Sequence, residues 1–170
     1  VDVVQGLVPF QKLLLLRGKY PGALISRPMH SVFYLFFNQQ SKAFADVGVR
    51  RALFGAIDRE GLTDDVLGGG QLPALSFVPP TYAAATGFDA EPCKTLPPEE
   101  SRKKIEEGRD ALAGTEMICN ASETLRTIME YVQQGFNKEL DLFLAIRMLE
   151  WGSFLESLKQ GDFQLARMSL

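Results

Sequence analysis

The sequence predicts an α/β domain built on a mixed, mostly parallel sheet with helices on both faces. Short runs rich in β-branched and aromatic residues alternate with longer amphipathic stretches, the order typical of strand–helix–strand units. Hydrophobic residues make up 46% of the 170 residues, enough for one sizeable core. The longest apolar runs fall well short of the ~20 residues that span a bilayer, so no membrane-spanning segment is expected.

The first part of the chain is predicted to alternate strand, helix, strand and helix. The predicted ranges are a strand at 1–5, a helix at 9–17, a strand at 24–37 and a helix at 47–67. Pro28 would bend the long strand. Asp46 can cap the second helix. Residues 58–61 have the character of a helix end, so we expect a kink at Gly61.

Residues 68–98 predict a long loop, because three consecutive glycines are followed by a proline-rich stretch. Loops of this length in compact domains are usually functional or mobile. Regular elements are predicted again beyond it. They are a helix at 98–113, a strand at 116–119, a helix at 122–140, a strand at 142–148, a helix at 151–160 and a strand at 163–168.

The charged and reactive residues argue against an enzyme. His30 is the only histidine, so no catalytic pairing of a nucleophile with a second histidine can be built. We find no metal-ligand spacing, no phosphate-binding loop at 68–70, and acid pairs only in polar helical stretches. The net charge of −3 is dispersed and gives no footprint for nucleic acid. We therefore expect no catalytic residues, no metal and no cofactor.

Two cysteines are too few for a disulfide framework. Cys93 and Cys119 would be able to pair in an oxidising compartment. Cys119 falls in an apolar, strand-like run, which favours a buried free thiol instead.

Two long strings carry a family resemblance. Residues 44–62 read F-x-D-x-x-V-R-x-A-L-x-x-A-I-D-R-x-x-L, and residues 150–167 read E-W-x-x-F-L-x-x-x-x-x-G-x-F-x-x-A-R. By pattern alone the first is only an amphipathic helix packed on a core. In order and spacing, both resemble signatures of the peptide-binding proteins of ABC importers, the extracytoplasmic oligopeptide and dipeptide receptors (solute-binding protein family 5). Other landmarks of that family resemble residues 1–9, 28–40, 76–80, 120–124 and 162–167.

The resemblance implies a class II periplasmic-binding-protein fold. Members of the family are much longer, so the chain is expected to be an internal piece. Residues 1–25 would be the end of the first lobe, and residues 26–170 the hinge strand with part of the second lobe. We expect no leader peptide within this sequence, and the periplasmic or extracytoplasmic location is what the resemblance implies.

The same resemblance implies a receptor without cofactor that closes two lobes around an extended peptide and delivers it to a membrane permease. Tyr34 stands where a tyrosine lines the peptide site, within the hinge strand. Its alternative role is to fill a two-sided core with its neighbours. Trp151 matches a tryptophan that flanks a ligand side-chain pocket. The alternative is again a core position, the usual place for an aromatic residue at a helix start.

Arg167 lies in an apolar, strand-like run and therefore needs either a charged partner or a cleft. The matching arginine of the family can meet a peptide's C-terminal carboxylate, for which guanidinium geometry is suited. The alternative is an internal ion pair, for example with Glu150. Lys159 aligns with a basic pocket position, and His30 is expected to be an incidental polar residue near a strand end.

Departures from the family pattern leave other functions open. Gly48 replaces a basic residue, residues 81–98 match poorly, and the sequence stops at Leu170, where a family tryptophan would stand. By the same resemblance, the segment whose aspartate grips a peptide's amino terminus is expected to lie outside this sequence. Related receptors carry dipeptides, nickel complexes, sugars or haem, although a single histidine does not favour nickel. A third possibility is a fragment that folds without binding ligand and serves only in protein association.

Overall fold

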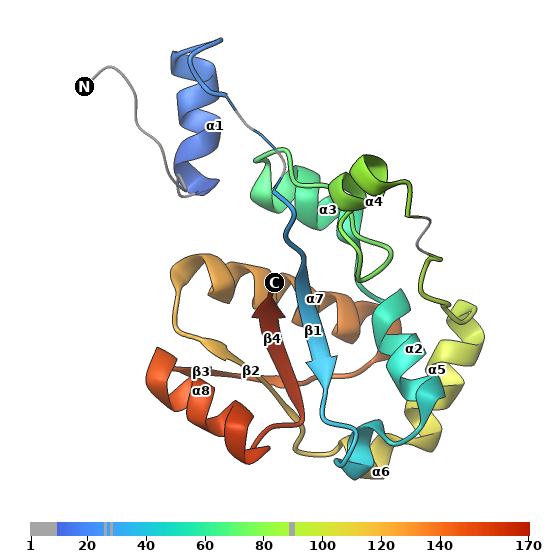
Figure 1. The fold of residues 1–170 in the computed structure, drawn as a ribbon. Coiled ribbons are helices and arrows are strands. Elements are labelled where there is room, and N and C mark those ends of the chain that lie inside the picture. The colour runs from blue at the N-terminus through green and yellow to red at the C-terminus, as the bar shows by residue number, and fades with distance from the viewer. Residues whose placement is uncertain (1–9, 26, 28, 89–90) are drawn as a thin grey trace.

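The computed structural model describes residues 10–25, 27, 29–88 and 91–170, which form a mixed α/β structure around a four-stranded sheet (Figure 1). The spatial order of the strands is β1-β4-β2-β3. The strands are β1 at Phe33–Phe37, β2 at Glu116–Asn120, β3 at Ala145–Leu149 and β4 at Leu165–Ser169. Strand β2 pairs in parallel with both β3 and β4, and β1 pairs antiparallel with β4. The predicted mixed, mostly parallel sheet is confirmed.

Helices cover both faces of the sheet, as predicted. Helix α7 (Glu123–Leu140) connects β2 to β3 on one face, and α8 (Trp151–Gln160) connects β3 to β4 on the other. The remaining elements are α1 Phe10–Lys19, a 3-10 turn at Lys42–Phe44, α2 Val47–Gly55, α3 Arg59–Gly61, a π-helical turn at Leu62–Leu67, α4 Pro80–Thr86, α5 Pro98–Glu107 and α6 Arg109–Leu112. No helix within the described ranges is both long and apolar enough to cross a bilayer.

The α7 face of the sheet holds the main core. Helix α7 places one apolar stripe on it, because its apolar residues recur at helical spacing. Helices α2, α5 and α6 pack against the same cluster. Its largest fully buried side chains include Phe44, Leu53, Ile105, Met117, Met129, Phe136 and Leu165.

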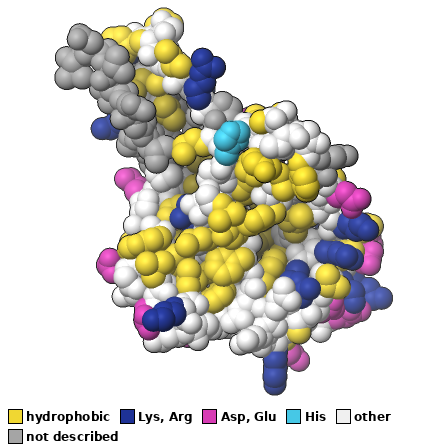
Figure 2. Space-filling view, viewed as in Figure 1, with side chains coloured by type: hydrophobic (Ala, Val, Ile, Leu, Met, Phe, Trp, Pro, Cys, Tyr) yellow, Lys and Arg dark blue, Asp and Glu magenta, His cyan; other side chains and the backbone are white. Residues whose placement is uncertain are grey.

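The α8 face is covered much less completely. Among the described residues, the buried cluster on this face consists of Ile118, Phe154 and Ala166. Around them, Phe36, Leu149, Leu158, Phe163 and Met168 are only partly buried. Figure 2 shows hydrophobic side chains gathered over the front of the molecule, the side on which Figure 1 places β1 and β4.

The predicted strand at 24–37 is much shorter in the structure. Strand β1 contains only Phe33–Phe37, because β4 pairs with these five residues and a strand exists only where its ladder does. Leu24, Ile25, Arg27 and residues 29–32 are not part of a strand. Pro28 and the predicted strand at 1–5 lie outside the described residues.

The predicted helix at 47–67 is divided. Asp46 caps α2 by accepting the N–H of Gly48, as expected, but α2 ends at Gly55. Asp58 was expected to lie in a helix end. It instead starts α3, because its carboxylate accepts the N–H of Gly61 at 2.9 Å. The π-helical turn that follows ends at Gly68. Its φ of 55° lies in the left-handed region, which glycine adopts without steric cost.

The predicted loop at 68–98 contains α4. Pro80 occupies its first turn and Gly87, with φ of 69°, ends it, which are the usual helix-start and helix-stop residues. The predicted helix at 98–113 is interrupted at Gly108, between α5 and α6. Helix α8 lies where predicted, and β3 and β4 are shifted by one to three residues.

Candidate ligand-binding site

Three of the predicted site residues lie at one edge of the sheet. The parallel strands β2, β3 and β4 end at this edge, and the antiparallel β1 begins there. Arg167 is near the end of β4, Tyr34 is near the start of β1, and Trp151 follows the end of β3. In open α/β sheets, ligands bind outside the carboxyl ends of the strands. The edge is therefore a candidate ligand site.

Arg167 is partly buried at this edge and forms no ion pair with any described acidic residue. Its guanidinium lies over the Phe33 ring, 4.5 Å from the centroid, and Nη1 donates to Asn120 Oδ1 at 3.4 Å. Nη2 donates to Ser169 Oγ at 3.4 Å, while the buried Nε has no hydrogen-bond partner among the described residues. Burial lowers the pKa of Arg167, although an arginine remains charged at neutral pH.

The alternative role for Arg167, an ion pair with Glu150, is not found in the structure. The Glu150 carboxylate caps α8 instead, accepting the N–H of Gly152 at 2.7 Å and of Ser153 at 3.4 Å. Among the described residues, the charged guanidinium of Arg167 therefore contacts neutral side chains, those of Asn120, Ser169 and Phe33. A partly desolvated cation held by weak, neutral hydrogen bonds is well suited to receive a carboxylate from a ligand.

Tyr34 is partly buried and faces the α8 side of the sheet with Phe36 and Met168, whereas Arg167 pairs with Leu35 and starts from the α7 side. Its ring lies 6.0 Å from that of Phe36 and 5.1 Å from that of Phe77, the latter edge to face. Trp151 is 49% exposed and rests against Phe154, with 5.8 Å between ring centroids. Neither aromatic residue is sealed in the core, so both have surface available for a ligand.

Lys159 does not join the other three residues. It is exposed near the end of α8, shortly before β4 begins, whereas Trp151 starts the same helix. At 1.5 Å per residue the two positions are about 12 Å apart along the helix axis. Lys159 therefore lies toward the edge of the sheet opposite Arg167.

The cysteines and the histidine have separate surroundings. Both cysteines are free. Cys119 is fully buried in β2, as expected, and burial raises the pKa of its thiol. His30 Nδ1 lies 3.0 Å from Thr81 Oγ1, which ties residues just before β1 to α4. Within the described ranges, no three histidine, cysteine or acidic side chains are placed to hold a metal ion together.

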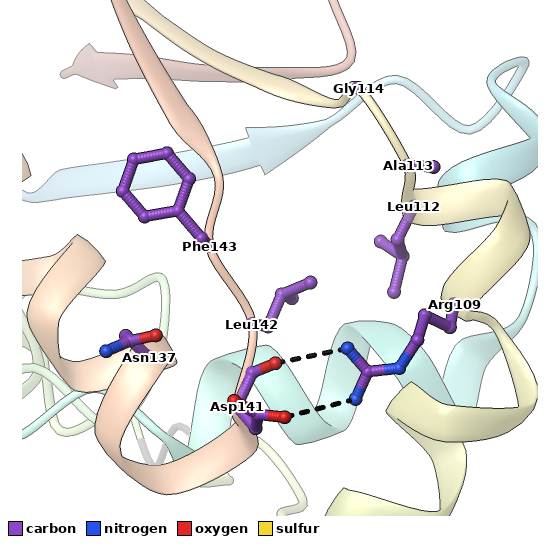
Figure 3. A pocket seen from close by; sticks show the side chains of 8 residues that line it. All are labelled: Arg109, Leu112, Ala113, Gly114, Asn137, Asp141, Leu142 and Phe143. Atoms are coloured by element: carbon purple, nitrogen blue, oxygen red, sulfur yellow. Dashed lines mark hydrogen bonds and ion pairs between the residues drawn. The ribbon is translucent and has the colours of Figure 1, made fainter.

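A separate pocket of about 320 Å³ lies where α6 and α7 end (Figure 3). Gly114 and Phe143 line it just before β2 and β3 begin, so it belongs to the opposite edge of the sheet. Arg109 Nη2 lies 3.6 Å from Asp141 Oδ2, and its Nε lies 2.6 Å from Glu106 Oε2. Because two carboxylates already engage this arginine, the pocket offers no free cation to a ligand.

Two residues near the candidate site were not predicted as site residues, although both fall within the family landmarks at 76–80 and 120–124. Asn120 is the last residue of β2 and accepts a hydrogen bond from Arg167, and a polar residue at the end of an apolar strand was an available signal. Phe77 contacts Tyr34 across 43 residues of chain, and no local pattern predicts that contact.

Comparison with known proteins places the chain in context. Residues 1–170 match the family model described as bacterial extracellular solute-binding proteins, family 5 Middle. The periplasmic murein peptide-binding protein MppA of Escherichia coli is 30% identical over 169 residues, which cover 94% of this chain and 30% of that protein. The periplasmic oligopeptide-binding protein OppA of Salmonella typhimurium is 28% identical over 177 residues, covering 98% and 32%.

A solved structure supports the same relationship. The murein tripeptide binding protein MppA of Escherichia coli superimposes with a TM-score of 0.78 at 28% identity, covering 95% of this chain and 33% of that one. The chain thus spans about a third of the length of the relatives it matches.

Proposed function

The chain belongs to the bacterial extracellular solute-binding proteins of family 5, and from this we propose that it forms part of a peptide receptor for an ABC importer. The observation that carries the proposal is Arg167, a partly desolvated cation without an acidic partner among the described residues. It lies at the sheet edge where such folds bind ligands, the same edge at which β1 begins with Tyr34 and α8 begins with Trp151, although its side chain starts from the α7 face and theirs from the α8 face.

In this proposal residues 26–170 supply the hinge strand and part of the second lobe, and residues 1–25 end the first lobe. Two observations support the division. The chain spans about a third of its relatives. In addition, α1 stands apart from the sheet in Figure 1 and adds no described side chain to either buried cluster. The complete receptor would act in the periplasm or otherwise outside the cytoplasm.

The proposed mechanism is closure of the two lobes around an extended peptide. Main-chain hydrogen bonds would hold the peptide, so that many sequences are accepted. Arg167 would receive the C-terminal carboxylate, and Tyr34 and Trp151 would form one wall. Lys159 remains a predicted basic residue of a pocket for a ligand side chain, and that pocket would lie away from Arg167. The closed receptor would then dock on the membrane permease, and its role is binding without catalysis or cofactor.

Ligands that copurify with the full-length protein containing this chain test the proposal. The protein would be purified natively, its ligands released by denaturation, and the extract identified by mass spectrometry. We expect short peptides in the wild type and a much smaller yield from the Arg167→Met variant. A single species of another class, such as a sugar, would show that the receptor has a different ligand.

A further inference from the structure

Phe77 is a large aromatic residue that the candidate site leaves unexplained. Its side chain is 55% exposed, yet its ring packs edge to face on Tyr34 at a centroid distance of 5.1 Å and an interplanar angle of 68°. Tyr34 in turn contacts Phe36, which packs on Phe163 at 5.1 Å. Phe77 is thus the exposed end of an aromatic row that begins in the partly covered α8 face.

We propose that Phe77 and Tyr34 form an aromatic subsite for one apolar, preferably aromatic, side chain of the bound peptide. The proposal rests on the proposed function, because it names the chemistry that the same receptor would select. A peptide side chain is the occupant that the geometry favours, since Tyr34 pairs with Met168, the residue after Arg167 in β4, and Arg167 offers a cation to a carboxylate at the same edge of the sheet.

The loop that carries Phe77 is held in place by Arg59. The Arg59 guanidinium lies 4.0 Å from the centroid of the Phe54 ring, and its Nε donates to the carbonyl oxygen of Ala74 at 3.0 Å. Its Nη1 donates to the carbonyl oxygens of Phe54 and Ile57, each at 3.0 Å. One side chain therefore fixes the chain three residues before Phe77 to the end of α2.

Hydrogen bonds on both sides of Phe77 continue this restraint. The Cys93 N–H donates to Leu75 O at 2.8 Å, and the Ser76 hydroxyl donates to Val78 O at 3.1 Å. A preorganised aromatic side chain loses little further freedom when a ligand binds, so more of the contact energy appears as affinity.

The same loop is tied to the segment that leads into β1. The Thr81 hydroxyl donates to Met29 O at 3.3 Å, and His30 contacts the Tyr82 ring edge at 6.3 Å between centroids. These contacts place the loop and α4 over the start of β1, as Figure 1 shows, which is the edge that holds Arg167. In Figure 2 the hydrophobic surface continues toward this region.

The experiment is a calorimetric comparison in the full-length protein that contains this chain. The peptides are tetraalanine and its four variants with one phenylalanine. When phenylalanine stands at one particular position of the four, we expect the wild type to bind that peptide about tenfold more tightly than tetraalanine, a difference of about 1.4 kcal/mol. Phe77→Ala should abolish that preference and leave the affinity for tetraalanine nearly unchanged.

Phe143→Ala is the matched control, because Phe143 is also an exposed phenylalanine but lies at the opposite edge of the sheet. It should keep the full preference. Phe77→Leu, which keeps an apolar side chain, should retain part of it.

Two results would overturn the proposal in different ways. If the wild type binds the peptides but Phe77→Ala keeps the preference, or if no position prefers phenylalanine, the subsite is wrong while the peptide receptor stands. If the wild type binds none of the peptides, the proposed function fails and the subsite with it.

Discussion

At the scale of single residues, Arg167 holds an unbalanced charge where most proteins would place a partner. Its hydrogen bonds to Asn120 and Ser169 are long, its Nε is buried without a described acceptor, and Glu150 is engaged at the start of α8. Such a group costs stability in the empty protein. We therefore expect Arg167 to behave differently from a structural arginine when it is replaced.

Arg167→Met should leave the free energy of unfolding unchanged or raise it by up to about 1 kcal/mol, because the apolar stem remains and the desolvated charge is removed. In the full-length protein, peptide affinity should fall about 10- to 100-fold through loss of a charged hydrogen bond. Urea unfolding and calorimetric titration measure the two effects. The control is Arg147→Met, which breaks the 2.8 Å pair with Glu116 and should not change peptide affinity. A large loss of stability in Arg167→Met would identify a structural residue.

At the scale of elements, the sequence predicted best where one strong local pattern decided the outcome. Helices α7 and α8 lie close to their predicted ranges, because a long apolar stripe marks α7 and Gly161 marks the end of α8. The strand at 24–37 was predicted too long, since its extent depends on pairing with β4. The helix break near Ala56 was missed because Asp58 is a helix start whose second partner, Tyr131, is 73 residues away.

The sequence predicted only part of the candidate site. The two long strings identified the family, which the family model confirms, and they pointed to Arg167 and Trp151. The contact of Phe77 with Tyr34, and the separation of Lys159 from Arg167, depend on how distant segments are arranged. No periodicity or spacing in the sequence contains that information.

The start of α3 gives a test at the element scale. A Cβ added to Gly61 would collide with the Tyr131 hydroxyl and the Asp58 carboxylate. Gly61→Ala should therefore lower the free energy of unfolding by about 1 kcal/mol through loss of the cap, although alanine normally favours a helix. The control Gly55→Ala meets only Thr95 atoms at 3.6 Å and should be neutral or stabilising. Thermal unfolding of both variants decides the point, and equal behaviour would contradict it.

The same cap makes stability depend on pH. The N–H of Gly61 and then the hydroxyl of Tyr131 lower the pKa of Asp58. Because the folded pKa lies below the unfolded value of about 3.9, the stabilisation is complete above that value and is lost as the pH falls through the folded pKa. Asp58→Ala should thus be less stable than the wild type at pH 7, and the difference should shrink below about pH 4. A difference that stays constant down to pH 2.5 would rule out the ionised cap.

At the scale of the whole molecule, the two faces of the sheet are unequal. The α7 face carries a complete core, whereas the α8 face leaves aromatic side chains partly exposed. Helix α1 joins neither core through a described side chain, and the described link from it is the 2.7 Å hydrogen bond of Arg17 to Gly68 O. This arrangement is expected of a segment whose packing partners belong to another lobe.

Hydrogen exchange on residues 1–170 tests that view of α1. Amides in α1 should exchange near the rate of an unfolded chain, because few contacts oppose local opening. Amides inside α7 should exchange at least about a thousandfold more slowly, because their hydrogen bonds break only when the core unfolds. Equal protection of the two helices in a monomer would show that α1 belongs to the same folded unit.

The central claim is that these residues form one wall of a two-lobe peptide receptor. The most direct test is calorimetric titration of mixed tri- to pentapeptides into the full-length protein and into residues 1–170 alone. If residues 1–170 supply only one wall of the site, as proposed, they should bind at least about a hundredfold more weakly, since each 1.4 kcal/mol of lost contact is about tenfold. No peptide binding by the full-length protein, or equal affinity of the two forms, would contradict the account.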